Sequence, residues 1–309
     1  ITMSRADSNS IEVARQILGA SAQPHVNLGA MTTYRVGGEA SLYVVANTEE
    51  DLFKVCDAKN ETELPVLVVG KGSNLLIADE GFKGIVVSLG SDFSYSDFDQ
   101  SSCEVDVGGI VALPALARRC VAAGLSGFEW AVGVPGSVGG AVRMNAGGHG
   151  SDMQACVQTV KLFDLHSGDI NTVVNEDLDF GYRYSAVSQQ QIVLGASLQL
   201  ADDDNNSGER VLDEIVRWRR DNQPGGQNAG SVFVNPSNET SAELIDRLGL
   251  KGFRIGSAQV SPKHANFVQA DVGGSANDVD AVMTAVAERV YAETGIALRT
   301  EIQRVGFED

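Results

Sequence analysis

Two glycine-rich clusters combine the residue types that can hold a negatively charged ligand without a basic side chain. One is GKGSN at 70–74, and the other is GVPGSVGG at 133–140. Glycine lets main-chain N–H groups approach a phosphate or carboxylate because no Cβ is in the way, and serine and asparagine add neutral donors. Two such clusters suit one long anionic cofactor. For the first cluster alone, a tight turn between two strands is an equally good interpretation.

The first cluster does not match the common nucleotide-binding fingerprints. A Walker loop needs Gly-Lys-Ser/Thr after four intervening residues, and Gly70 has no such follower. A dinucleotide fingerprint needs a third glycine at position 75, where Leu75 begins another apolar run. Amide donors are nevertheless a sensible way to bind an anion in an acidic protein, because their dipoles act locally.

Composition limits the class of protein. A length of 309 residues with 43% hydrophobic residues allows about two domains with buried cores. Lys and Arg total 23 against 41 Asp and Glu, and the formal charge of -18 would repel a phosphate backbone, so we expect no nucleic-acid binding. No apolar run reaches the roughly 18 residues that cross a bilayer, and the opening residues lack the hydrophobic centre of a signal peptide. We therefore expect a cytoplasmic protein without membrane insertion.

The cysteines do not suggest a metal site or a disulfide framework. Cys56, Cys103, Cys120 and Cys156 are widely spaced, and no CxxC pair is present. We expect four free thiols, mostly buried, and no bound metal.

The apolar pattern predicts the elements that position the two clusters. A helix at 10–18, a strand at 40–46, a helix that opens at Thr48 and a strand at 65–69 precede the first cluster. Further along, the pattern predicts strands at 103–107, 159–164, 172–174, 191–199, near 260 and within 298–307, and helices at 113–123, 209–220, 241–248 and 276–294. The middle strands favour an antiparallel sheet. The polar stretch 201–208 is expected to be a loop at a domain boundary.

An ordered set of motifs resembles one known family. The motifs are TYRVGG at 33–38, GKGSN at 70–74, GLSGFE at 124–129, PGSVGG at 135–140, MNAG at 144–147, YRYS at 182–185, AGSVF at 229–233, NP at 235–236, KHANF at 263–267 and the late Glu301. Their order resembles the vanillyl-alcohol-oxidase-like FAD-binding fold and, more closely, the UDP-N-acetylenolpyruvoylglucosamine reductase (MurB) family. Each motif alone is weak, whereas the ordered set is specific.

The resemblance implies the fold, the ligands and the reaction. The implied fold is α+β, with a two-subdomain FAD-binding unit (PCMH/VAO-like) and a C-terminal α+β substrate-binding domain. The implied boundaries are 1–92 together with a terminal strand at 301–309, then 93–205, then 206–300. The implied reaction uses non-covalent FAD and NADPH to reduce UDP-N-acetylglucosamine enolpyruvate to UDP-N-acetylmuramate for peptidoglycan, with hydride from flavin N5. We expect a monomer.

Three residues match the catalytic positions of the family: Arg183, Ser231 and Glu301. Hydride addition to an enolpyruvyl group moves charge into its carboxylate, which Arg183 could grip through its fixed charge. A protonated Glu301 could donate to the same charge, and Ser231 could protonate the carbon that bears the carboxylate. Taken alone, Arg183 better suits a surface arginine stacked on tyrosine. Ser231 also suits a helix or turn cap, and Glu301 an exposed edge-strand carboxylate, the commonest use of such a residue.

The resemblance also implies binding residues. Those for the cofactor are Tyr34, Arg35, Gly70, Lys71, Gly72, Ser73, Asn74, Pro135, Gly136, Ser137, Gly139, Gly140 and Asn145. Those for the substrate are Tyr182, Asn235, Lys263 and His264. Asn222 and Val234 stand where the family often has lysines, so the charge that binds the substrate pyrophosphate would come from Arg219, Arg220, Lys263 or Arg254.

Two other functions remain open from the sequence. One is a different FAD-dependent dehydrogenase or oxidase of the same fold, which would bind FAD and ignore the UDP-sugar. The other is a non-catalytic nucleotide-binding protein, which would show no turnover with NADPH. The joint presence of arginine, serine and glutamate at the three catalytic positions favours the reductase, since a binding module has no need of all three.

Overall fold

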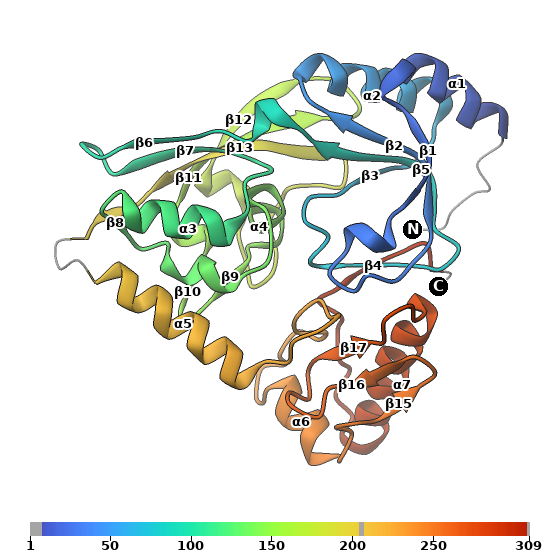
Figure 1. The fold of residues 1–309 in the computed structure, drawn as a ribbon, viewed down its shortest axis with the longest axis vertical. Coiled ribbons are helices and arrows are strands. Elements are labelled where there is room, and N and C mark those ends of the chain that lie inside the picture. The colour runs from blue at the N-terminus through green and yellow to red at the C-terminus, as the bar shows by residue number, and fades with distance from the viewer. Residues whose placement is uncertain (1–7, 204–206, 308–309) are drawn as a thin grey trace.

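The first unit of the computed structural model, which describes residues 8–203 and 207–307, is a helix-covered sheet. Its strand order is β1 (Gln23–Asn27), β2 (Glu39–Ala46), β5 (Phe82–Leu89) and β3 (Val66–Val68), with β1 antiparallel to β2 and the others parallel. Helices α1 (Ser8–Leu18) and α2 (Glu49–Thr62) lie together over this sheet (Figure 1). A capping box at Thr48 starts α2, as the acidic first turn predicts.

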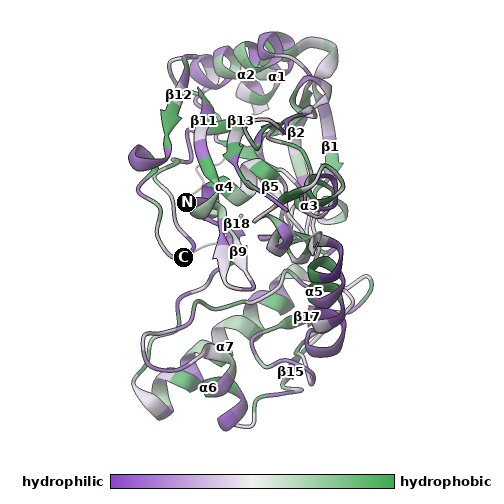
Figure 2. Ribbon diagram, turned by 90° about the vertical axis from the view of Figure 1, so that its left-hand side faces the viewer, coloured by the Kyte–Doolittle hydropathy of each residue, from purple (hydrophilic) through white to green (hydrophobic). Residues whose placement is uncertain are grey.

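The second unit is an antiparallel sheet covered by helices. Its strand order is β12 (Ile170–Val174), β11 (Val157–Asp164), β13 (Gln191–Gln199), β7 (Glu104–Gly108) and β6 (Ser96–Asp99). Helices α3 (Leu113–Ala122), α4 (Val138–Met144) and α5 (Gly208–Asn222) share its hydrophobic core. In Figure 2 the strands β5 and β13 are mainly hydrophobic and α5 is mainly hydrophilic. The antiparallel sheet expected from the sequence is confirmed.

The third unit is smaller and follows α5. It contains α6 (Ser241–Arg247), a sheet of β15 (Arg254–Ile255), β16 (Ala258–Val260) and β17 (Val268–Ala270), and α7 (Ala276–Thr294). The side chain of Ser275 caps α7 by accepting from the Asp278 N–H, as the sequence predicts. The buried face of α7 packs on the small sheet.

The chain end returns to the first unit. Strand β18 (Gln303–Val305) pairs in parallel with β4 (Leu75–Ile77), directly after the first glycine cluster. Asp79 also joins the first and third units, because its carboxylate accepts from the N–H groups of Ala276 and Asn277 at the start of α7. These contacts hold the third unit beside the first glycine cluster.

Some expectations differ from the structure. The pattern did not predict α4, because Gly139 and Gly140 lie in its first turn and glycine disfavours helix. The expected loop at 201–208 contains a short strand β14 (Ala201–Asp202), which pairs with β8 (Leu125–Ser126). Residues 204–206 of that loop, and 1–7 and 308–309 of the expected domains, lie outside the described residues.

The remaining pair of short strands, β9 (Gly147–Gly148) and β10 (Ser151–Asp152), forms a hairpin after α4. All four cysteines are free, and three of them are buried. No helix in the described ranges has the length and apolar character needed to cross a membrane.

Candidate active site

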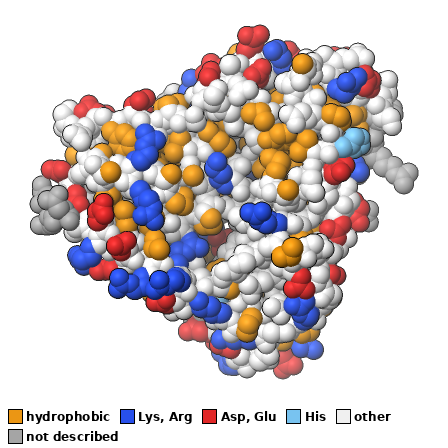
Figure 3. Space-filling model, in the orientation of Figure 1, with side chains coloured by type: hydrophobic (Ala, Val, Ile, Leu, Met, Phe, Trp, Pro, Cys, Tyr) orange, Lys and Arg blue, Asp and Glu red, His pale blue; other side chains and the backbone are white. Residues whose placement is uncertain are grey.

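A cavity of about 1150 Å³ lies between the three units, and Figure 3 shows the surface hollowed near the middle of the face drawn. It exceeds the roughly 300–1,000 Å³ of ordinary small-molecule sites, so it can take a ligand of dinucleotide size. The chain supplies six Lys or Arg side chains and two Glu side chains to its lining: Lys59, Lys71, Arg143, Arg183, Arg219, Arg304, Glu63 and Glu301. A chain with a net charge of -18 therefore encloses a positively charged cavity.

The two glycine clusters meet at the wall of this cavity. A Cβ on Gly70 would lie 2.4 Å from the hydroxyl oxygen of Ser137, and one on Gly136 would lie 3.6 Å from that of Ser73. Gly72 has a φ of +59°, and a Cβ there would meet the carbonyl oxygen of Met31 at 2.3 Å. At 72 only glycine fits, because the clash is with backbone atoms, and at 70 a Cβ would displace the Ser137 hydroxyl.

Donors in this part of the cavity have no protein partner. Within the described ranges, no backbone N–H from 70 to 73 donates to the protein, and neither Lys71 nor Arg143 forms an ion pair. Burial lowers the pKa of Arg143, although an arginine remains charged at neutral pH. Unpaired N–H groups beside unpaired cations form a donor set suited to a pyrophosphate.

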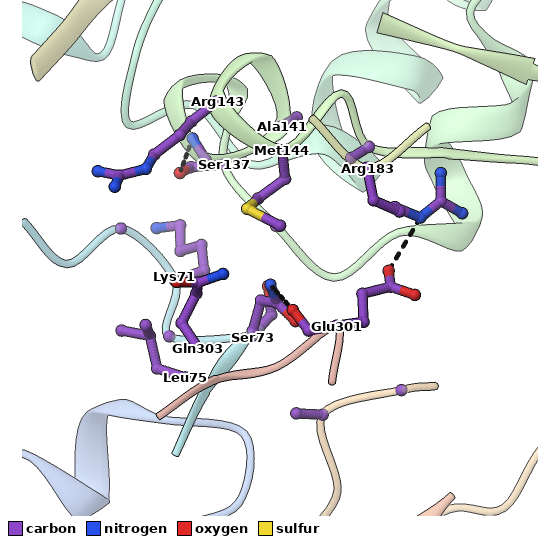
Figure 4. A pocket seen from close by; sticks show the side chains of 18 of the residues that line it. Lys71, Ser73, Leu75, Ser137, Ala141, Arg143, Met144, Arg183, Glu301 and Gln303 are labelled. Carbon is purple, nitrogen blue, oxygen red and sulfur yellow. Dashed lines mark hydrogen bonds and ion pairs between the residues drawn. The ribbon is translucent and has the colours of Figure 1, made fainter. Parts of the chain in front are cut away.

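Arg183 and Glu301 form an ion pair at the other end of the cavity. The Arg183 Nε donates to Glu301 Oε1 at 2.9 Å, and the two side chains are 20% and 17% exposed (Figure 4). Arg183 also donates to the carbonyl oxygen of Gly147 at 3.0 Å, and its guanidinium lies 4.8 Å from the Tyr182 ring centre. The surface interpretation of Arg183 is therefore wrong, although the tyrosine stacking does occur.

The backbone at Arg183 is unusual. Its φ is +58°, in the left-handed region that a non-glycine residue rarely adopts. The turn is closed by two hydrogen bonds between Gly181 and Tyr184, at 3.0 and 3.1 Å. Asn145 supports this turn by donating from Nδ2 to the Gly181 carbonyl at 2.9 Å. Strain of this kind is stored where the surrounding structure holds a side chain in a required direction.

The carboxyl of Glu301 has a raised pKa. Its burial disfavours the charged form, and this effect outweighs the opposing influence of the Arg183 guanidinium. Glu301 thus keeps a proton to higher pH than an ordinary glutamate. It is not the exposed edge-strand residue that the sequence alone allowed.

Ser231 lies on the segment next to Glu301. It lines the cavity, and the carbonyl of the following residue, Val232, accepts from the Glu301 N–H at 2.8 Å. Ser231 caps no helix, since the next helix along the chain, α6, begins at Ser241. The structure therefore brings Arg183, Ser231 and Glu301 to one cavity.

Most of the residues predicted to bind the cofactor line the cavity as well. They are Gly70, Lys71, Gly72, Ser73, Asn74, Pro135, Gly136, Ser137 and Gly140, and the predicted substrate residues Tyr182 and Asn235 join them. Their contacts with ligands stay predictions.

Four of the predicted cofactor residues lie off the cavity lining. Tyr34 is fully buried in the core of the third unit, where burial raises the pKa of its hydroxyl, and Arg35 is exposed. Gly139 donates its N–H to the Gly109 carbonyl at 2.8 Å. Asn145 is buried, and its side chain supports the turn that carries Arg183. Of the four, Asn145 acts on the site indirectly, through the turn that carries Arg183.

The predicted substrate residues Lys263 and His264 also lie off the cavity. Lys263 points to the end of α5, where its Nζ donates to the Arg220 carbonyl at 2.6 Å. The His264 ring packs edge-on against Phe267, with centroids 4.7 Å apart, and burial lowers its pKa. The neighbouring Asn266, which the sequence did not single out, lines the cavity instead.

Among the proposed pyrophosphate cations, only Arg219 lines the cavity. Arg254 pairs with Asp271 at 2.7 Å, away from the cavity. Burial lowers the pKa of Arg219, and burial together with Arg219 lowers the pKa of His149, whose ring meets Trp218 edge-on. The sequence does not predict Arg143 as a site residue because it does not predict helix α4, which carries it. Ser137, the N-cap of that helix, is the signal that could have revealed it.

Family models match both parts of this architecture. A model described as FAD binding domain matches residues 40–173, and one described as UDP-N-acetylenolpyruvoylglucosamine reductase, C-terminal domain, matches residues 222–305. With the fold and the cavity, these matches define a class of protein: a flavin-dependent reductase built from an FAD-binding unit and a C-terminal domain.

Individual relatives narrow this class. The chain is 43% identical to the UDP-N-acetylenolpyruvoylglucosamine reductase of Heliobacterium modesticaldum, over 89% of this chain and 88% of that protein. It is 40% identical to that of Gloeobacter violaceus, over 92% and 96%. The crystal structure of the Thermus caldophilus enzyme (MurB) has a TM-score of 0.80 at 35% identity, covering 92% of this chain and 98% of that one. The chain belongs to the UDP-N-acetylenolpyruvoylglucosamine reductase family, which confirms the resemblance and the α+β fold.

Proposed function

We propose that the chain reduces UDP-N-acetylenolpyruvoylglucosamine to UDP-N-acetylmuramate, with FAD as cofactor and NADPH as reductant. The observation that carries the proposal is the meeting of Arg183, Glu301 and Ser231 in the cavity that both glycine clusters line. Two relatives are named for this activity, and this chain matches 88% and 96% of their lengths. The proposed division assigns 1–92 with 301–309 and 93–205 to FAD, and 206–300 to the substrate.

The first glycine cluster and the start of α4 would hold the cofactor. The unpaired N–H groups of 70–73, with Lys71 and Arg143, suit the two phosphates of FAD. FAD supplies the hydride acceptor and donor that no amino-acid side chain provides. The cavity would receive NADPH and the UDP-sugar in turn beside the bound FAD. The monomeric state and the cytoplasmic location expected from the resemblance remain part of the proposal.

Arg183 would bind the substrate carboxylate and stabilise the charge that develops on it. Three of its five N–H donors are used, by Glu301, Gly147 and Asn145, and the others are left for a ligand. Because these contacts hold the guanidinium before substrate arrives, no reorganisation is needed as charge builds up.

Protonated Glu301 would donate a hydrogen bond from its O–H to the same carboxylate. Its raised pKa keeps the proton available, and its partner Arg183 fixes the direction of the carboxyl. Ser231 would give its hydroxyl proton to the carbon that bears the carboxylate. A serine hydroxyl is a weak acid, so this transfer requires a strongly basic acceptor and close positioning.

The two half-reactions can be followed in the visible absorbance of the purified protein. We expect a flavin spectrum that anaerobic NADPH bleaches and that UDP-N-acetylenolpyruvoylglucosamine restores. A yellow protein that NADPH reduces but the UDP-sugar does not reoxidise would point to another substrate. A colourless protein that takes up no added FAD would contradict the proposal.

A further inference from the structure

Asn266 is a buried polar residue in the cavity whose role the proposed function leaves open. It lies in the loop between β16 and β17, and it is 3% exposed. It lines the cavity, as do Ser231, Phe233 and Glu301. A buried amide is stable only where hydrogen bonds replace those it made with water, so its partners define what it does.

All the side-chain hydrogen bonds of Asn266 go to the segment after Ser231. Its Oδ1 accepts from the Phe233 N–H at 3.0 Å, and its Nδ2 donates to the Phe233 carbonyl at 2.8 Å. The main-chain carbonyl of Asn266 accepts from the Val232 N–H at 2.9 Å. The side-chain amide of Asn266 therefore bonds Phe233 as a residue on a neighbouring antiparallel strand would, by donating one hydrogen bond and accepting another.

The opposite edge of the same segment is held by the strand of Glu301. The Glu301 N–H donates to the Val232 carbonyl at 2.8 Å, and the Val234 N–H donates to the Arg299 carbonyl at 2.9 Å. Residues 232–234 are thus fixed on both edges. Ser231 directly precedes them, and Gly230, on its other side, has a φ of +80° in a turn. The position of the Ser231 hydroxyl therefore depends on hydrogen bonds to both edges of the segment 232–234, and Asn266 supplies those on one edge.

We propose that Asn266 is a positioning residue, which acts through Ser231 by fixing the backbone that carries the proton-donating hydroxyl. The inference rests on the proposed function. Without the amide, the Phe233 N–H and carbonyl lose their partners inside a buried layer, and the segment must move to find others. A displacement of about 1 Å at a reacting group can cost on the order of 100-fold in rate.

A double-mutant cycle on the two half-reactions tests this role. Wild type, Asn266→Ala, Ser231→Ala and the double variant are loaded with FAD, and rapid mixing follows reduction by NADPH and reoxidation by the UDP-sugar. We expect Asn266→Ala to slow reoxidation by about 10- to 100-fold and to leave reduction unchanged within about twofold. In the Ser231→Ala background, the same substitution should have little further effect, because the group through which it acts is gone.

Asn266→Asp keeps the size of the side chain and guards against a variant that fails to fold. Ionised aspartate still accepts from the Phe233 N–H but cannot donate to the Phe233 carbonyl, whereas the protonated form can. We expect slow reoxidation at neutral pH and partial recovery at lower pH, relative to wild type at the same pH. A structural defect alone would not recover in this way.

Asn175 offers a matched control in the second unit. Its side-chain amide donates to the carbonyls of Gln154 and Val157 at 3.0 and 2.7 Å, and it does not line the cavity. Asn175→Ala should leave both half-reactions unchanged.

The outcomes separate this inference from the proposed function. If Asn266→Ala slows both half-reactions equally, or if its effect adds fully to that of Ser231→Ala, the positioning role is excluded while the reductase stands. If wild type itself is not reoxidised by the UDP-sugar, the proposed function fails first.

Discussion

The two ends of the cavity use positive charge differently. At one end, Arg183 is held by Glu301 and two backbone carbonyls, on a turn with a strained φ. At the other end, Arg143 and Lys71 line the cavity without an ion pair to any described residue (Figure 4). Arg143 projects from an ordinary helix, α4. The same charge is thus fixed at one end and left open at the other.

This difference indicates what each end is for. A cation that is already fixed costs no reorganisation when charge develops during a reaction, which suits the end with Arg183. A partly buried cation without a partner is destabilising until an anion binds, which suits a permanent charge on a cofactor. We therefore expect substitutions at the Arg183 end to change rates and substitutions at the Arg143 end to change affinity.

The largest effect is expected for Ser231→Ala. Loss of the proton donor should slow reoxidation by the UDP-sugar by about 10²- to 10⁴-fold, while reduction by NADPH and the Kd for FAD remain close to wild type. Rapid-mixing absorbance measures both steps. If both half-reactions slow equally, Ser231 is not the proton donor. The two ends of the cavity would then not differ in the way described.

A somewhat smaller effect is expected for Glu301. Glu301→Ala should slow reoxidation by about 10²- to 10³-fold because one donor to the developing charge is lost. Glu301→Gln keeps an N–H donor and should retain part of the rate. Wild-type turnover in Glu301→Ala would exclude this residue from the reaction.

The pH dependence is a second test of the role of protonated Glu301. Because its pKa is raised, reoxidation by wild type should fall as pH rises through that pKa, and Glu301→Gln should lack this step. Between the ordinary pKa of glutamate and the raised one, the folded state binds more protons than the unfolded state. The stability from this group is therefore full at low pH and is lost as pH rises. Urea unfolding across pH, with Glu301→Gln as reference, checks the sign.

At the open end, Arg143→Met should weaken FAD binding by about tenfold or more, since a hydrogen bond to a charged group contributes about 1.5–3 kcal/mol. With saturating FAD, both half-reactions should stay near wild type. Flavin fluorescence titration measures the Kd. Arg210→Met is the control, because that exposed arginine pairs with Glu214 on α5, outside the cavity lining. A lower rate with unchanged FAD affinity would reverse the assignment of the two ends.

The smallest effect concerns the contact that joins the units. Asp79→Ala removes the carboxylate that caps α7, and we expect a loss of about 0.5–2 kcal/mol in the free energy of unfolding. Urea denaturation measures it. The Kd for FAD should change little, since Asp79 does not line the cavity. A large change in that Kd would show that the units depend on each other for binding.

The sequence predicts long periodic elements well and short irregular ones poorly. Helix α7 and strand β13 match their predicted ranges, because period and capping agree over many residues. Helix α4 was missed because two glycines open it, and β4 was missed as a strand partner of β18 because that pairing joins distant parts of the chain. Local pattern carries no information about such pairings.

The site residues also divide into those that the sequence predicts and those that it does not. Residue type alone predicts an anion site at the two glycine clusters, with a tight turn as an equally good interpretation of the first. Arg183 and Glu301 are 118 residues apart, so only the family resemblance could bring them together in advance. The motif predicts Lys263 and His264 near the substrate, yet their neighbours Asn266 and Phe267 are the residues that reach the cavity. A motif locates a loop, whereas packing decides which of its side chains points inward.

A crystal structure of the FAD-loaded protein with UDP-N-acetylenolpyruvoylglucosamine tests the central claim most directly. We expect the enolpyruvyl carboxylate within hydrogen-bond distance of the Arg183 guanidinium, and the FAD phosphates against residues 70–73. A substrate carboxylate bound at Lys71 and Arg143, or FAD phosphates beside Arg183, would contradict the account.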